Sequence, residues 1–186
     1  MAERPEVTIH IGQVYATREA TILTTIVGSG VTACLFDPEA RVGGMSHFML
    51  PAAGGDGPTA GAEAGIQAMD LLIGSIQKSG GELRRFQAKL FGGAHVLRGG
   101  GSGDGVPERN IGFIEEFMRA ERIAVVSRDL GGYLPQRVRF QTDTGKVYVK
   151  RLGPHMLRQT RAEEREHLLT LAQERPRPGN VTLFGG

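Results

Sequence analysis

The sequence predicts an α+β domain, in which strands and helices follow one another without a regular βαβ alternation. The first half of the chain holds short β-branched and apolar runs separated by turn residues, which indicates strands. Two later segments repeat apolar residues at the 3.6-residue period of a helix, and a third, strongly charged segment near the C-terminus is also expected to be helical. Together these patterns predict roughly seven or eight strands and three helices.

The first 50 residues are expected to form a series of short strands. Residues 7–11 alternate apolar and polar side chains, as a half-buried strand does. The following apolar runs are too short for buried helices, and turn or breaker residues close them at Asp37-Pro38 and at Pro51. The expected strands span residues 7–11, 21–27, 31–36 and 46–50.

The second half mixes helices with further strands. Residues 62–78 place their apolar side chains on one helical face and end before Gly80-Gly81. Residues 111–118 predict a second helix with Asn110 as its N-cap, and the charged segment 157–174 predicts a C-terminal helix. Further strands are expected at residues 86–91, 123–126, 137–140 and 146–150, the last two joined by a hairpin turn.

Length and composition favour one intracellular domain. The 186 residues are enough for a sizeable core, and we expect a domain over 1–152 followed by a helix and tail over 153–186. The single Cys excludes an internal disulfide and a thiolate-rich zinc site. A net charge of +2, spread along the chain, gives no reason to expect nucleic-acid binding. Because no long apolar run or signal peptide is present, we expect a cytoplasmic protein without membrane insertion.

Several residues are of types that often form phosphate, thiol or metal sites, but the sequence does not favour such a site at any of them. The Gly-rich run 99–105 lacks the Lys-Ser/Thr ending of a phosphate loop, so a flexible surface loop is the expected structure. Cys34 lies inside an apolar strand and is expected to be a core residue. The histidines show neither helical i, i+4 spacing nor a carboxylate cluster, so we expect no shared metal site; they are His10, His47, His95, His155 and His167.

An ordered set of motifs resembles a known family. Residues 24–38 contain a Gly-Ser turn and a strand ending in Asp-Pro, and residues 41–51 continue with Gly-Gly-Met-Ser-His-Phe-Met-Leu-Pro. These segments resemble the CheD family of chemoreceptor glutamine deamidases. The similarity extends over roughly residues 7–152 and includes the segments 91–94, 108–111, 129–132 and 137–152.

The resemblance implies a fold, an activity and partners. The fold would be two packed mixed β-sheets flanked by helices, similar to the catalytic domain of cytotoxic necrotizing factor toxins. The activity would be hydrolysis of Gln side-chain amides of methyl-accepting chemotaxis proteins to Glu and ammonia, without a cofactor. The implied partners are chemoreceptor cytoplasmic domains and a CheC-type phosphatase, which would place the protein in chemotactic adaptation.

The resemblance also implies a thiol mechanism and assigns its positions. A Cys thiolate attacks the amide carbon, a His acts as base and acid, a hydroxyl orients the His, and backbone N–H groups stabilise the oxyanion. By motif, the His is His47 and the orienting hydroxyl is Thr24. The oxyanion turn is Gly28-Ser29, and the nucleophile position is Gly30.

Gly30 departs from the family pattern because it has no side chain that could attack a carbonyl. Ser29 is expected to face away from His47, and Cys34 lies about 13 Å along the strand from position 30. Two hypotheses follow. The chain is an active deamidase in which Ser29 or a water bound at Gly30 attacks, or in which the glycine is an engineered substitution. Alternatively, it binds receptors or a CheC-type phosphatase without hydrolysis.

Overall fold

The computed structural model describes residues 3–52, 61–97 and 105–174, and it confirms the α+β class with two mixed sheets. The four-stranded sheet has the order β1 (Glu6–Thr8), β3 (Ile22–Val27), β8 (Gln136–Gln141), β9 (Val147–Arg151). The five-stranded sheet has the order β2 (Val14–Thr17), β5 (Val42–Phe48), β4 (Val31–Asp37), β6 (Gln87–Gly92), β7 (Ala124–Leu130).

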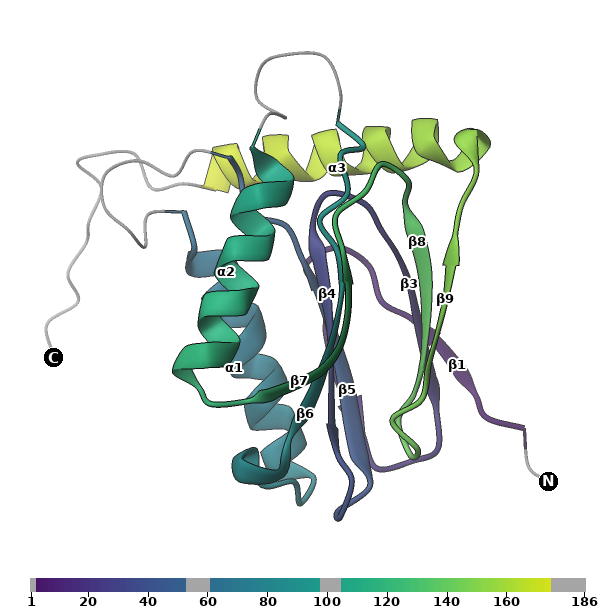
Figure 1. Ribbon diagram of the computed structural model, residues 1–186, viewed down its shortest axis with the longest axis vertical. Coiled ribbons are helices and arrows are strands. Elements are labelled where there is room, and N and C mark those ends of the chain that lie inside the picture. The colour runs from purple at the N-terminus through teal and green to yellow at the C-terminus, as the bar shows by residue number, and fades with distance from the viewer. Residues whose placement is uncertain (1–2, 53–60, 98–104, 175–186) are drawn as a thin grey trace, which may run out of the picture.

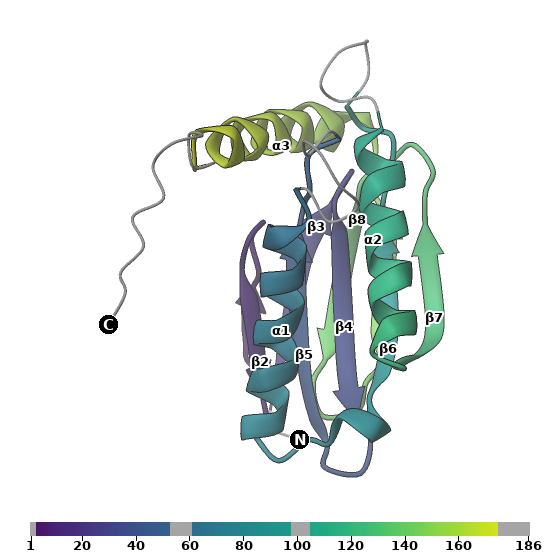
Figure 2. The ribbon, with the colours of Figure 1, turned by 90° about the vertical axis from the view of Figure 1, so that its left-hand side faces the viewer.

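The helices occupy two different places around the sheets. Helices α1 (Glu63–Lys78) and α2 (Val106–Ala120) cover the outer face of the five-stranded sheet, and the four-stranded sheet packs on its other face (Figure 1). Helix α3 (Pro154–Glu174) instead lies across one end of the sheets, transverse to the strands (Figures 1 and 2). A short 3-10 helix, Leu83–Arg85, precedes β6. The end beneath α3 is where the turn between β3 and β4 lies.

Two apolar clusters account for the layers. Val31, Ala33 and Leu35 of β4 pack with α1 and α2, whereas Cys34 and Phe36 pack with the four-stranded sheet. Successive side chains of a strand point to opposite faces, so β4 is covered on both sides and reads as a continuous apolar run. The expected arrangement of two packed sheets flanked by helices is thereby confirmed; the likeness to the toxin domain stays a prediction.

Some boundaries differ from those expected. Strand β2 has only four residues and was not predicted. Strand β5 begins at Val42, earlier than expected, because its glycines permit close packing: a Cβ on Gly44 would lie 2.6 Å from Leu72 Cδ1 of α1. Because glycine has a low strand propensity, the sequence pattern does not predict the first part of this strand.

The prediction that Asn110 caps a helix is wrong, because α2 already begins at Val106. The buried Asn110 amide instead accepts the Leu50 N–H at 2.8 Å and donates to the Leu50 carbonyl at 2.9 Å. It therefore fixes the chain that follows β5 to α2.

Two predicted features fall on parts of the chain that the structure does not describe. The Gly-rich run 99–105 lies outside the described residues except for Gly105, and the tail from residue 175 lies outside them entirely. Within the described ranges, no helix is both long enough and apolar enough to cross a bilayer. The proposed division of the chain at residue 152 stays a prediction.

Candidate active site

The turn Gly28–Gly30 carries the chain from one sheet to the other. It follows β3 of the four-stranded sheet and precedes β4 of the five-stranded sheet. The chain after β6 holds it from one side: the Ala94 N–H donates to the Gly28 carbonyl at 2.8 Å, and the Gly93 N–H donates to the Gly30 carbonyl at 2.7 Å. These bonds fix the turn by its carbonyl groups.

His47 lies on β5 opposite Thr32 of β4 and is only 1% exposed. Its Nδ1 is 2.8 Å from the Thr25 hydroxyl, which itself donates to the Ile9 carbonyl at 2.6 Å. The Thr25 hydroxyl has a single hydrogen and donates it to the Ile9 carbonyl. In its contact with His47 the hydroxyl must therefore accept, so the Nδ1 atom of His47 carries a hydrogen. In the neutral ring the lone pair is then on Nε2, which has no hydrogen-bond partner among the described residues.

In the structure, His47 contacts the hydroxyl of Thr25 rather than that of the expected Thr24. Along β3, Leu23, Thr25 and Val27 are buried, whereas Thr24 is only half-buried. Because successive strand side chains alternate between faces, only one of the two threonines can face the space between the sheets. The structure therefore brings the hydroxyl of Thr25, and not that of Thr24, to His47, and the orienting role of either threonine stays a prediction.

His47 is held in its neutral form. Burial lowers its pKa to about 3, and the neighbouring His167 and His10 add to the shift in the same direction. Desolvation disfavours a charged imidazolium, and positive neighbours disfavour it further. A neutral imidazole with a free Nε2 lone pair has the protonation state of a general base.

Gly30, at the nucleophile position that the family resemblance predicts, has no room for a side chain in this backbone. A Cβ on Gly30 would lie 2.5 Å from the Phe48 carbonyl oxygen and 3.0 Å from Met49 Cβ. The Ser29 hydroxyl is fully buried and makes no hydrogen bond of acceptable geometry with any described residue, His47 included. Neither position presents a nucleophile that is hydrogen-bonded to the base.

Cys34 is a core residue, as the sequence predicted. It is buried opposite Met45, and its burial strongly raises the pKa of the thiol. A thiol is reactive as its thiolate, which an apolar environment disfavours. Cys34 is therefore unsuited to act as a nucleophile.

Sequence reasoning missed Glu164 of α3. The Ser29 N–H donates to Glu164 Oε1 at 2.6 Å, and the Glu164 side chain is almost completely buried. Burial raises the pKa of Glu164 to about 7, although the Ser29 N–H and the other backbone N–H groups of the Gly28–Gly30 turn oppose the shift. In the sequence this residue is one acidic residue in the charged run 163–166, so nothing marks it.

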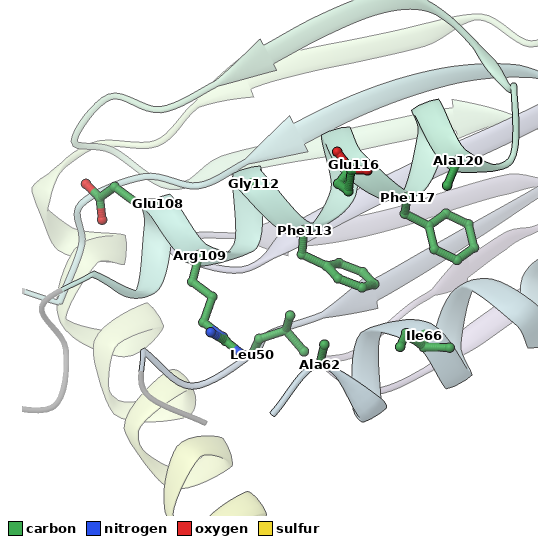
Figure 3. A pocket seen from close by; sticks show the side chains of 10 residues that line it. All are labelled: Leu50, Ala62, Ile66, Glu108, Arg109, Gly112, Phe113, Glu116, Phe117 and Ala120. Atoms are coloured by element: carbon green, nitrogen blue, oxygen red, sulfur yellow. The ribbon is translucent and has the colours of Figure 1, made fainter. Parts of the chain in front are cut away.

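A separate apolar groove lies between α1 and α2, on the opposite face of the five-stranded sheet from His47. Figure 3 shows Phe113 and Phe117 of α2 projecting toward Ile66 of α1, with Arg109 extending toward Leu50. The groove is lined by Leu50, Ala62, Ile66, Glu108, Arg109, Gly112, Phe113, Glu116, Phe117 and Ala120. It contains no part of the His47 and Gly28–Gly30 arrangement.

Comparison with known proteins gives one consistent result. A family model described as "CheD chemotactic sensory transduction" matches residues 49–151. A protein of Burkholderia thailandensis named "Probable chemoreceptor glutamine deamidase CheD 1" is 42% identical over 181 residues, covering 92% of this chain and 76% of that protein. Proteins of Burkholderia mallei and Burkholderia pseudomallei with the name "Probable chemoreceptor glutamine deamidase CheD" are 41% identical over 178 residues, with the same coverage. By its sequence and over most of its length, this chain belongs to the CheD family.

Proposed function

We propose that this chain acts in chemotactic adaptation, in the cytoplasm, at the glutamine side chains of chemoreceptors. The observation that carries the proposal is that the Ser29 N–H donates to the buried carboxyl oxygen Oε1 of Glu164, 2.6 Å away, at the turn where the family motif predicts the oxyanion site. A site that holds a carboxylate oxygen also suits the oxygen of a carboxamide, because the two groups have nearly the same shape.

The reaction proposed for this site is hydrolysis of the carboxamide to a carboxylate and ammonia. In the thiol mechanism that the family resemblance implies, a Cys thiolate at the position of Gly30 would add to the amide carbon, and the oxygen would take negative charge that the turn N–H groups stabilise. His47 Nε2 accepts the proton of the nucleophile and returns it to the departing ammonia, and water completes the hydrolysis. Thr25 keeps the proton on Nδ1, so that Nε2 remains the basic atom.

Gly30 removes one part of this machinery, and we propose that hydrolysis is strongly impaired while receptor binding is kept. Loss of the catalytic nucleophile in serine proteases removes most of the rate enhancement. The small part that remains comes from the oxyanion site and from substrate binding. The second candidate function is therefore a binding protein for receptors or a CheC-type phosphatase. Two observations favour it: among the described residues His47 Nε2 has no hydrogen-bond partner, and Gly30 has no side chain.

The test is an ammonia-release assay on a receptor cytoplasmic fragment with the natural chain, Gly30→Cys and Gly30→Ala. Both variants add a Cβ that must displace the Phe48 carbonyl, so Gly30→Ala controls for the fit and only Gly30→Cys adds a thiol. We expect Gly30→Cys to release ammonia at least about 10³-fold faster than Gly30→Ala and the natural chain.

Two results would contradict the proposal in different ways. Equal ammonia release by the natural chain and Gly30→Cys would contradict the impaired hydrolysis. Failure of the natural chain to bind both the receptor fragment and a CheC-type phosphatase in a pull-down would contradict the binding role.

A further inference from the structure

Helix α3 buries polar side chains where a helix that packs by hydrophobic burial would bury apolar ones. A surface helix ordinarily buries an apolar stripe. Among the described side chains of α3, however, the two that are buried are Thr160 and Glu164, whereas Leu169 is 66% exposed. Burying a carboxyl group costs free energy unless specific partners compensate. The partners of Glu164 therefore define what α3 does.

Those partners belong to the candidate active site. Glu164 Oε1 accepts the Ser29 N–H, and the space for a Cβ on Gly28 is already filled: that atom would lie 2.5 Å from Glu164 Oε1 and 2.9 Å from Thr160 Cγ2. The helix thus sits directly on the turn, with the Glu164 carboxyl in van der Waals contact with the glycine backbone. This is the group that a deamidation product would present there.

The same helix closes the approach to His47. His167, one turn after Glu164, lies over Gly12, where its Cε1 is 3.6 Å from the position of a Cβ. The Gly12 N–H in turn donates to the His47 carbonyl at 2.7 Å. Beneath α3, His47 is 1% exposed and Ser29 is fully buried. With α3 in place, the turn and His47 therefore expose almost no surface to a glutamine of another protein.

We propose that α3 is an internal ligand of the active site, whose Glu164 carboxyl occupies the position of a substrate side-chain amide, so that a receptor segment must displace α3 to bind. The inference depends on the proposed function for the identity of the displacing segment. It adds that the free protein is autoinhibited by its own product-like side chain.

The attachment of α3 suits displacement. Its apolar contacts, Leu157 and Leu168, pack against a small cluster of Ala94, Val96 and Leu97, which is separate from the two main clusters of the domain. Releasing the helix therefore leaves both main cores intact. An element with few buried apolar contacts belongs to the low-stability part of a fold, which opens most readily.

The first test measures the affinity of the full-length chain for a receptor cytoplasmic fragment, with Glu164→Ala compared to Glu163→Ala. Glu163 precedes Glu164 on the same helix, has the same side chain and is exposed, so its variant is a matched control. We expect Glu164→Ala to bind about tenfold more tightly, because removal of an internal competitor raises the binding-competent fraction, and Glu163→Ala to bind as the natural chain does. If Glu164→Ala binds no more tightly than Glu163→Ala, α3 is a structural helix and the inference is overturned.

A second readout needs no receptor. In a Gly30→Cys background, the rate at which iodoacetamide alkylates the new thiol reports access to the turn, since Cys34 is buried. We expect alkylation to be about tenfold faster with Glu164→Ala than with Glu163→Ala. Equal rates would overturn the inference. If no variant binds the receptor fragment, the proposed function fails, and the alkylation rates alone decide whether α3 blocks the site.

Discussion

At the scale of residues, the site depends on which atom of His47 carries the proton. The Thr25 hydroxyl has one hydrogen, and the Ile9 carbonyl receives it, so His47 Nδ1 must donate to Thr25. A threonine hydroxyl can orient an imidazole in this way without adding charge, unlike the carboxylate of a serine-protease triad. His47, the Thr25 hydroxyl and the Ile9 carbonyl of the loop before β2 therefore form one chain of hydrogen bonds.

We predict that Thr25→Val destabilises the protein by about 1–3 kcal/mol, because it leaves the Ile9 carbonyl and the His47 Nδ1 hydrogen buried without partners. Thr24→Val is the matched control, since its side chain lies on the other face of β3. Urea denaturation measures the free energy of unfolding. In a Gly30→Cys background, Thr25→Val should also slow ammonia release more than Thr24→Val does. A larger effect of Thr24→Val on both measurements would return the orienting role to that residue.

At the scale of elements, sequence patterns predicted the strands and helices better than their exact contacts. The β-branched and apolar runs gave β3, β4 and β6, because a strand covered on both faces needs apolar residues throughout. The motif spacing predicts that the Thr24 hydroxyl contacts His47, whereas the alternation of buried and half-buried residues along β3 places the Thr25 hydroxyl there. Glu164 could not be predicted, because its role comes from the docking of a helix 135 residues further along the chain than Ser29.

The docking of α3 should weaken as pH rises. The pKa of Glu164 is about 7 in the docked state and 4.5 ordinarily, so the docked carboxyl holds its proton more strongly than the released one. The contribution to stability is therefore complete below pH 4.5 and is lost as pH rises through about 7. At about 1.4 kcal/mol per pKa unit, the full loss is about 3 kcal/mol.

The variant Glu164→Gln isolates this effect, because its amide does not titrate while all histidines remain. We predict that the melting temperature of the natural chain falls relative to that of Glu164→Gln between pH 5 and pH 8. Thermal denaturation followed by circular dichroism measures both. Parallel curves for the two proteins would show that the Glu164 carboxyl keeps the same charge across this range and would contradict the prediction.

At the scale of the whole molecule, the two ends of β4 serve different purposes. Figure 2 shows α3 across one end of β4. Gly30 precedes the strand at that end, and Asp37 closes it at the other end, about 23 Å away at about 3.3 Å per residue. Asp37 is fully buried and accepts N–H groups from Glu39, Ala40 and Glu82 in addition to an ion pair with Arg85 at 2.9 Å. The Asp-Pro ending that helped to identify the family is thus a structural anchor remote from the site.

This separation predicts a variant that damages the fold without altering the site. Burial opposes ionisation, but the hydrogen bonds from Arg85 and from the backbone lower the pKa of Asp37 to about 2. Its stabilisation is therefore present above pH 3.8 and is lost as pH falls through about 2. We predict that Asp37→Asn lowers the free energy of unfolding at pH 7 by about 3 kcal/mol, because Arg85 loses its buried partner.

The control for this last variant is Glu39→Gln, which changes an exposed carboxylate 3.5 Å from the same Arg85 and should cost less than about 1 kcal/mol. Urea denaturation at pH 7 and pH 3 gives the free energies, and the difference between the natural chain and Asp37→Asn should narrow at the lower pH. Receptor-fragment affinity, measured below the unfolding transition, should be the same for all three proteins. A loss of affinity in Asp37→Asn comparable to its loss of stability would mean that the two ends of β4 are coupled, and that the site at Gly28–Gly30 depends on the anchor at the far end of its strand.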